Sequence, residues 1–478
     1  MLFSSLEFLY LFLPVLLILY FAVPWRAKNP LLLALSLLFY AGGEPVFVLL
    51  MMFTIAVDYA LGLAIGRRVT SGTEAEKKKA GRLLLLGLVY NLGVLALFKY
   101  TSPLFSTLAP IFGKTASAMP QIPLPIGISF YTFQALSYLI DVFRSRVRAQ
   151  KSLVAFGVYI SLFPQLIAGP IVRYSDIDQA LTSRTHSVQQ TAGGLRLFCL
   201  GLAKKVLFAN PAGELWQTFC REDAAGATVL GAWLGLCLFA LQIYFDFSGY
   251  SDMAVGLGRV FGFDFPQNFR YPYITRSVSD FWRRWHITLS SWFREYVYIP
   301  LGGNRCGRLR CYRNLLITWL LTGIWHGATL NFALWGLWFF FWIAMEKAFL
   351  SRVLDRVPGI FRHGYALAVI LFGWLIFAAD GTTLTVAGAF RYAGHLFGAG
   401  GIPLTSGTVG YEFLRNLLLL VAMTLGATPL PAALFRHFSH RLPRAGQATA
   451  NLLSVASLLI CTAYLVNSGY NPFLYFRF

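Results

Sequence analysis

One histidine, His326, stands in an apolar stretch that carries no Asp, Glu, Lys or Arg between Arg313 and Glu346. It follows Trp325 in the motif GIWHGA, residues 323–328. Ionisable side chains inside membrane segments are costly and usually face the protein interior or a water-filled cavity. An imidazole that apolar burial keeps neutral can accept a proton. The motif predicts a general base; the alternative is a buried histidine that only stabilises the fold.

The apolar stretch around His326, residues 314–345, has an unusual length. A membrane helix needs roughly 20 apolar residues, so this stretch is too long for one span and too short for two. The glycines and Thr322 beside His326 are where a helix break costs least. Non-helical backbone at membrane depth is tolerated only where protein buries it or where it lines a cavity. The length therefore predicts a break and a cavity at His326.

A second stretch, residues 279–303, is both basic and aromatic. Read as one helix beginning at Ser279, it places an aromatic stripe beside a cationic one. The stripes consist of Trp282, Trp285, Leu289, Trp292 and Tyr296, and of Arg283, His286, Ser290 and Arg294. The pattern is typical of an interfacial helix. It also fits a helix whose His286 and arginines face an interior pocket, and spacing alone leaves both interpretations open.

The composition indicates a helical membrane protein. Of the 478 residues, 57% are hydrophobic and 13% are charged, whereas soluble domains carry roughly 25% charged residues. The apolar segments lack the alternation of a barrel, so helices are expected, in a single membrane domain over residues 1–478. The predicted spans are 8–24, 31–41, 45–65, 83–99, 124–143, 153–169, 195–209, 228–247, the interrupted 314–345, 365–379, 412–427 and 450–467, with a weaker one at 383–398.

The net charge of +20 is explained by basic cytoplasmic loops, so no nucleic-acid partner is expected. Placing the basic clusters inside puts both the N-terminus and the tail, residues 468–478, on the outer face. Residues 259–313 then form basic interfacial helices on the cytoplasmic side. The first apolar segment follows a Glu and lacks a small-residue cleavage site, so it is expected to be a retained span.

Metal and cofactor motifs are not evident in the sequence. The six cysteines form no CxxC pair, and neither His286 nor His326 has a partner at ligand spacing, so no metal is expected. The sequence also contains no P-loop, GxSxG or GxGxxG motif. Asp246 and Ser248 lie in a polar cluster at the end of a span. They either line the cavity at His326 or cap and connect helices.

Five stretches together resemble the membrane-bound O-acyltransferase (MBOAT) family, in its bacterial alginate O-acetyltransferase branch. They are PIGISFYTFQALSYLIDVFR (125–144), FPQLIAGPIVRYSD (163–176), YFDFSGYSDMAVGLGRVFGF (244–263), NFRYPYITRSVSDFWRRWHITLSSWFREYVYIPLGGNR (268–305) and GIWHGA (323–328). The resemblance implies a ring of about 11–13 membrane helices, with re-entrant or interfacial helices around a central funnel. It places the essential histidine at His326 and the second family position at His286.

The resemblance also implies a reaction. Acetyl-CoA would serve as the cytoplasmic acyl donor without being a bound cofactor, and the product would be an O-acetylated exported or cell-surface polysaccharide such as alginate. The implied partner is an extracytoplasmic SGNH-like acetyltransferase, and the implied location is the bacterial inner membrane. His286 would orient or polarise the thioester carbonyl, and Trp285, Trp325, Asp246 and Ser248 would line the cavity. The CoA phosphates would meet some of Arg276, Arg283, Arg284 and Arg294.

The C-terminal residues NPFLYFRF carry an F-x-Y-x-x-F arrangement formed by Phe473, Tyr475 and Phe478. This is similar to the C-terminal motif of the small partner in the related D-alanylation system. By that resemblance Tyr475 would be an acyl relay loaded at His326; the alternative is an aromatic membrane anchor. Two other functions stay open: D-alanyl or peptidoglycan O-acyl transfer by the same fold, and a polytopic transporter with a proton-relay histidine.

Overall fold

The computed structural model describes residues 2–108, 122–220, 226–381, 384–467 and 469–472. For residues 106–108 it describes the backbone only. Within these ranges the regular structure is helical and no strand is formed. The all-helical class predicted from composition is therefore confirmed. The chain divides into two compact units: unit 1 comprises Met1–Phe198 and Tyr250–Pro266, and unit 2 comprises Cys199–Gly249 and Gln267–Phe478. The prediction of one membrane domain over the whole chain stays a prediction.

Six helices among the described residues are long and apolar enough to cross a membrane: Phe47–Ser71, Glu74–Phe105, Val229–Val260, Leu330–Leu354, Gly359–Ala378 and Pro443–Asn467. The bent pair Gly407–Arg415 and Leu417–Gly426, with an angle of 61°, makes a seventh if it is one span. A shorter apolar helix covers Phe8–Ala22. The protein is thus a multi-pass membrane protein.

One predicted span, residues 153–169, is not a single helix. Helix α6 ends at Ser161, and α7 begins at Phe163 with Pro164 in its first turn. Proline has no backbone N–H and its ring clashes with the preceding turn of a helix, so Pro164 favours a helix that starts here rather than one that continues from α6.

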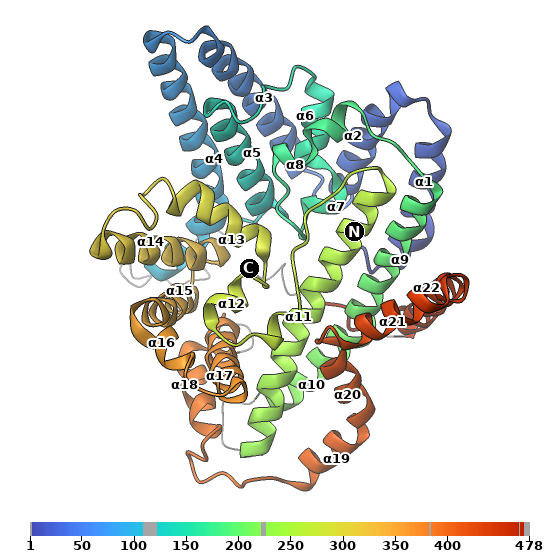
Figure 1. The fold of residues 1–478 in the computed structure, drawn as a ribbon, viewed down its shortest axis with the longest axis vertical. Helices are drawn as coiled ribbons and strands as arrows, with labels where there is room; N and C mark the ends of the chain where they lie inside the picture. The colour runs from blue at the N-terminus through green and yellow to red at the C-terminus, as the bar shows by residue number, and fades with distance from the viewer. Residues whose placement is uncertain (1, 109–121, 221–225, 382–383, 468, 473–478) are drawn as a thin grey trace. The chain divides into compact units, whose positions relative to one another are not determined.

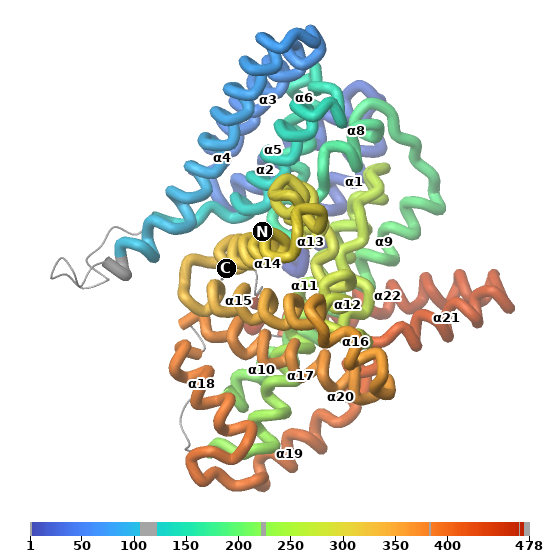
Figure 2. Tube along the Cα trace, turned by 60° about the vertical axis from the view of Figure 1, so that its left-hand side comes forward, coloured from blue at the N-terminus to red at the C-terminus, as the bar shows by residue number. Residues whose placement is uncertain are grey.

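In unit 1, α3, α4 and α5 pack side by side (Figures 1 and 2). Gly62 of α3 and Gly87 of α4 leave room for Tyr138 and Leu139 of α5, which lie where a Cβ would be. The helices that begin in this unit are η1 (Phe8–Phe12), α1 (Leu13–Ala22), α2 (Trp25–Ala41), α3 (Phe47–Ser71), α4 (Glu74–Leu108), α5 (Ile128–Phe143), α6 (Leu153–Ser161), α7 (Phe163–Leu166), α8 (Tyr174–Thr182) and α9 (Val188–Ala203).

Unit 2 holds the remaining helices; α9 and α11 each contain one boundary between the units, and the third follows Pro266. They are η4 (Lys204–Ala209), α10 (Asn210–Phe219), α11 (Val229–Val260), η5 (Pro272–Ile274), α12 (Val278–Trp282), α13 (Ile287–Phe293), η6 (Arg294–Tyr298), α14 (Arg308–His326), α15 (Leu330–Met345), η7 (Glu346–Leu350), α16 (Ser351–Leu354), α17 (Gly359–Ala378), α18 (Val386–His395), α19 (Gly407–Arg415), α20 (Leu417–Gly426), α21 (Leu430–Arg441) and α22 (Pro443–Asn467).

Several helix starts are set by local sequence. Ser152, Ser277, Thr385 and Ser406 each accept a hydrogen bond from the backbone N–H three residues later. A side-chain oxygen at this position satisfies one of the N–H groups that have no partner within the helix. These caps fix where α6, α12, α18 and α19 begin.

Helices α14 and α15 form a tight hairpin, visible in both views (Figures 1 and 2). Gly323 of α14 faces Gly336 of α15, so the two backbones come close together. A Cβ at Gly336 would lie 2.5 Å from the carbonyl oxygen of Trp319. Gly323 of the GIWHGA motif therefore allows the two helices to pack closely. This role is additional to lowering the free-energy cost of the break at His326.

The continuous helix predicted from Ser279 to 303 is wrong. Helix α12 stops at Trp282, and α13 starts at Ile287 after a turn in which His286 adopts a left-handed conformation, with φ at 42°. The backbone of this turn pairs with the preceding segment: Arg270 N–H donates to the carbonyl of Arg284, and Ile287 N–H donates to that of Asn268. Because these bonds replace helical ones, the two predicted stripes do not form.

Candidate active site

His326 is the last residue of α14. The next residue, Gly327, is extended, and the chain becomes helical again at Leu330. The predicted break at His326 is thus confirmed. The side chain is buried, with 8% of its surface exposed.

Aromatic rings surround His326. The ring centroids of Trp325, Trp335 and Phe377 lie 4.9, 5.1 and 5.3 Å from that of the imidazole. Phe332 stacks on it at 6.3 Å. The imidazole of His326 thus lies in an apolar shell. The carbonyl groups at the C-terminal end of α14 favour the imidazolium that forms once a proton is accepted. Together these features suit a general base.

His286 has a defined tautomer. The Oδ1 atom of Asn268 lies 3.1 Å from Nδ1 of His286 and also accepts from the backbone N–H and the hydroxyl of Thr288. Because a backbone N–H can only donate, the Asn268 atom is an oxygen, and Nδ1 of His286 must carry the hydrogen. The lone pair of the neutral ring is therefore on Nε2, a buried atom without a hydrogen-bond partner among the described residues.

This tautomer limits what His286 can do. Burial lowers the pKa of His286 to about 3, so the ring stays neutral near pH 7. A neutral ring with its hydrogen on Nδ1 offers an acceptor at Nε2 and no donor there. Trp325 lies between the two histidines, with its ring centroid 6.3 Å from His286. His286 is therefore equipped to accept a hydrogen bond next to the aromatic shell of His326.

The left-handed backbone at His286 is strained for a residue with a Cβ. Phe247 and Phe269 contact its ring, at centroid distances of 4.7 and 6.5 Å. Together with Asn268, these contacts hold the side chain in one orientation. Sequence spacing gave no sign of this conformation, because it depends on a partner from the preceding loop.

Glu346 anchors the helix that leads to His286. The carboxylate is buried and accepts from the backbone N–H groups of Val278 and Ser279, at 2.7 and 2.9 Å. It also accepts from the hydroxyls of Ser279 and Tyr365, at 2.6 and 3.2 Å. The sequence analysis missed this residue, which ends the uncharged stretch after His326.

Replacing Glu346 with alanine is expected to destabilise the protein by about 1–3 kcal/mol for each buried donor left without a partner. The Glu346→Gln variant keeps one acceptor oxygen and should lose less. Thermal unfolding of the purified protein in detergent measures both. Equal melting temperatures for the alanine variant and the wild type would show that Glu346 does not hold α12.

The four predicted phosphate-binding arginines occupy different settings. Arg284 is ion-paired with Asp280, at 2.9 Å. Arg276, Arg283 and Arg294 are exposed. Of the four, Arg294 lines a cavity of about 180 Å³, together with Ser290 and Thr322 among others. Thr322 lies one turn before His326, so this cavity is next to the hairpin that carries the candidate base.

The residues predicted to line a central cavity are all buried. Trp285 packs between aromatic rings of the unit 2 core, with the Trp374 centroid at 4.7 Å. Asp246 forms an ion pair with Lys205 at 2.6 Å. Lys205 was missed by the sequence analysis because it is 41 residues away in an apolar segment. The cavity expected around Trp285, Trp325, Asp246 and Ser248 stays a prediction, and Tyr475 lies outside the described residues.

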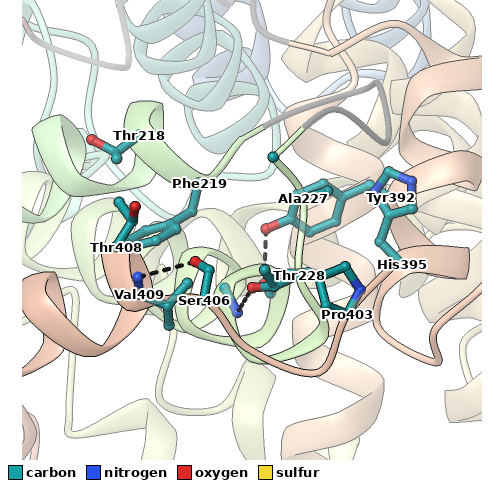
Figure 3. Close-up of a pocket in the computed structure, with 13 residues that line it drawn as sticks. Thr218, Phe219, Ala227, Thr228, Tyr392, His395, Pro403, Ser406, Thr408 and Val409 are labelled. Atoms are coloured by element: carbon teal, nitrogen blue, oxygen red, sulfur yellow. Dashed lines mark hydrogen bonds between the residues drawn. The ribbon is translucent and has the colours of Figure 1, made fainter. Parts of the chain in front are cut away.

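A second cavity, of about 340 Å³, lies in another part of unit 2 (Figure 3). Most of its hydroxyl groups hold local structure: Thr228 accepts from Gly231 N–H, Ser406 accepts from Val409 N–H, and Tyr392 donates to the carbonyl of Ala232. It contains none of the predicted site residues. Within the described ranges, no group of three or more His, Cys, Asp or Glu could hold a metal.

Comparisons with known proteins cover this site. The model of the MBOAT, membrane-bound O-acyltransferase family, matches residues 126–377, a range that includes both His286 and His326. The "Probable alginate O-acetylase AlgI" of Pseudomonas aeruginosa is 43% identical over 80% of this chain and 72% of its own. That of Pseudomonas putida is 37% identical over the full length of both. The "Peptidoglycan O-acetyltransferase" of Helicobacter pylori is 34% identical over 79% and 77%.

Proposed function

Because the chain belongs to the membrane-bound O-acyltransferase family, we propose that it passes an acetyl group from cytoplasmic acetyl-CoA across the membrane. The acetyl group would O-acetylate an exported or cell-surface polysaccharide such as alginate. The protein is an enzyme, an O-acyltransferase of the acetyltransferase type. The observation that carries the proposal is a buried histidine, His326, placed at the helix break of the α14–α15 hairpin.

The reaction needs one proton acceptor. His326 takes the proton of an acceptor hydroxyl while its oxygen attacks the thioester carbonyl carbon. A C–O bond forms, the C–S bond then breaks, and the leaving thiolate takes the proton back from the imidazolium. The products are an acetate ester and free CoA. The surrounding rings exclude water, which would otherwise hydrolyse the thioester.

His286 has an assisting role in this proposal. Its Nε2 accepts a hydrogen bond from an N–H or O–H group of a substrate and so orients that group near His326. The sequence-based expectation that His286 polarises the carbonyl would require a donor at Nε2, which the neutral ring lacks. Orientation is therefore the part of the predicted role that the tautomer supports.

The donor approaches from the cytoplasmic side in this proposal, and its phosphates contact exposed arginines. Arg294 is the best placed of the four, because it lines the cavity that reaches Thr322 near His326. Arg276 and Arg283 are available for further phosphate contacts, whereas Arg284 is occupied by Asp280. The acetyl group leaves on the outer face of a bacterial inner membrane. Both chain termini lie on that face, where an SGNH-like acetyltransferase completes the transfer.

Reconstitution tests the function directly. The purified protein in proteoliposomes, given acetyl-CoA labelled in the acetyl group and a hydroxyl acceptor, should release free CoA and form acetate ester. Thioester-independent movement of a solute, with no CoA release, would favour a transporter instead.

Peptidoglycan is the second candidate acceptor, because a peptidoglycan O-acetyltransferase is 34% identical over most of both chains. Acetylated muropeptides in the producing cell would support it, and acetylated exopolysaccharide would support the first candidate. D-alanine in place of acetate in the product would show that the donor has been assigned wrongly.

Tyr475→Phe tests the acyl relay. The substitution removes only the phenolic oxygen and keeps the aromatic ring. If Tyr475 carries the acetyl group, polymer acetylation should fall to background while the protein remains folded in the membrane. Undiminished acetylation, measured by ester content of the polymer, would leave the tail as a membrane anchor.

A further inference from the structure

The last described residues turn back from α22 onto η4 and α10 within unit 2. Three consecutive residues are held there by side chains of these helices. Nε2 of Gln217 lies 3.1 Å from the hydroxyl of Tyr470. The amide Nδ2 of Asn210 donates to the carbonyl of Tyr470 and to Oδ1 of Asn471, each at 3.3 Å. The ammonium of Lys205 donates to the carbonyl of Pro472.

The lysine in this contact is buried and paired. Lys205 Nζ lies 2.6 Å from Oδ1 of Asp246, and the two side chains are only 4% and 3% exposed. A buried ammonium is costly unless a carboxylate and further acceptors surround it. Its three N–H donors need partners, and Asp246 and the carbonyl of Pro472 supply two. The carbonyl of Pro472 therefore helps to stabilise the buried ammonium of Lys205.

The shape of α10 also suits the tail. Asn210, Gly213 and Gln217 share one helix face by their spacing of three and four residues. A Cβ at Gly213 would lie 2.3 Å from Nε2 of Gln242 and 2.9 Å from the hydroxyl oxygen of Tyr470, so a glycine makes room for both side chains. A cavity of about 480 Å³ adjoins this face and is lined by Val206, Asn210, Pro211, Glu214, Ala463, Tyr464, Leu465 and Asn467.

We propose that Lys205, Asp246, Asn210, Gly213 and Gln217 form a receptor groove for the chain's own C-terminal segment. Lys205 is its positioning residue. Two polar side chains and a glycine on α10 receive the first residues of the segment, and the buried ion pair then holds the carbonyl of Pro472. The occupant is this segment because its residues 470–472 already lie in the groove.

The groove limits how far the remaining tail can reach. Six residues follow Pro472 in the sequence, and an extended chain spans at most about 3.3–3.6 Å per residue. Tyr475 is the third of them, three peptide units beyond the residue whose carbonyl Lys205 holds. Resting on the proposed function, this tether determines where the hydroxyl of Tyr475 can accept and deliver an acetyl group.

Peptide binding tests the groove without any acetyl donor. A chain ending at Gly469 is purified in detergent, and a fluorescent peptide of residues 470–478 is titrated into it. We expect saturable binding that a scrambled peptide of the same composition does not reproduce. The double substitution Lys205→Met with Asp246→Asn removes both charges together and should weaken binding at least 10-fold. Lys347→Met, which removes a lysine that contacts Asn304 and Cys311 instead, should leave binding unchanged.

A second measurement uses the full-length chain, in case the shortened one does not fold. Carboxypeptidase digestion followed by mass spectrometry reports how fast residues are released from the C-terminus. Release back through Pro472 should be at least 10-fold faster in the double variant than in the wild type or in Lys347→Met. Equal release rates in the wild type, the double variant and Lys347→Met would contradict the proposed groove. Peptide binding that is unchanged in the double variant would contradict it as well. The outcome is independent of catalysis, because a His326→Ala chain should bind its tail normally even if acetylation is lost.

Discussion

Acetylation is expected to fall by about 10²- to 10⁴-fold when His326 is replaced by alanine, the range that general acid–base groups contribute. The imidazole of His326 is enclosed by the rings of Trp325, Trp335 and Phe377. Without it, the hydroxyl must attack while still protonated, which raises the barrier of the step. Ester content of the polymer, or CoA release in proteoliposomes, measures the loss.

The matched control for this variant is His437→Ala. His437 is exposed on α21 and contributes to no site described above. It should acetylate like the wild type. Near-normal acetylation by a stably expressed His326→Ala protein would show that His326 is not the general base, because another group would then take the proton.

Adding a methyl group at Gly336 is expected to destabilise the α14–α15 hairpin by about 1–3 kcal/mol or more, the cost of overpacking a tight contact. The new Cβ would lie 2.5 Å from the carbonyl oxygen of Trp319 and 3.2 Å from its carbon. Both are backbone atoms, so the helices must move apart. Because His326 ends α14, the displacement should also lower acetylation, and the melting temperature should fall with it.

Gly364→Ala provides the control for helix propensity. Gly364 is inside α17, and a Cβ there would meet nothing within 4 Å. Alanine is about 1 kcal/mol more favourable than glycine within a helix, so this variant should be as stable as the wild type or more so. If Gly336→Ala proves equally harmless, the hairpin does not depend on the close backbone contact.

The two histidines illustrate different ways in which burial sets chemistry. His326 is enclosed by rings at a helix end, where the helix carbonyls would favour an imidazolium formed under the proposed mechanism. His286 is locked by Asn268 into the tautomer with its hydrogen on Nδ1, which leaves an acceptor at Nε2. One residue is thus suited to take up a proton and the other to orient a group that carries one.

Much of the site could be predicted from local sequence, because its determinants are local. The length of the apolar stretch and the glycines in it predicted the break at His326, which α14 and α15 confirm. The scarcity of charge predicted an all-helical membrane protein. Such inferences hold because the bilayer requires every backbone group to be satisfied within its own segment, so span length and breakers can be read residue by residue.

Tertiary structure decided what depends on partners far away in the chain. The turn at His286 forms because hydrogen bonds to Asn268 and Arg270 replace those of a continuous helix. The helical periodicity of residues 279–303 contains no information about these partners, which precede the segment. The role of Lys205 depends on Asp246 and Pro472, which are distant in sequence and contact it only in the folded chain. A helical pattern reports propensity along one segment, whereas the orientation of a buried polar group depends on which acceptor the fold brings to it. The sequence by itself thus determined the membrane class and the position of the candidate base, and only the folded chain determined the tautomer of His286 and the contacts of Lys205 with Asp246 and Pro472.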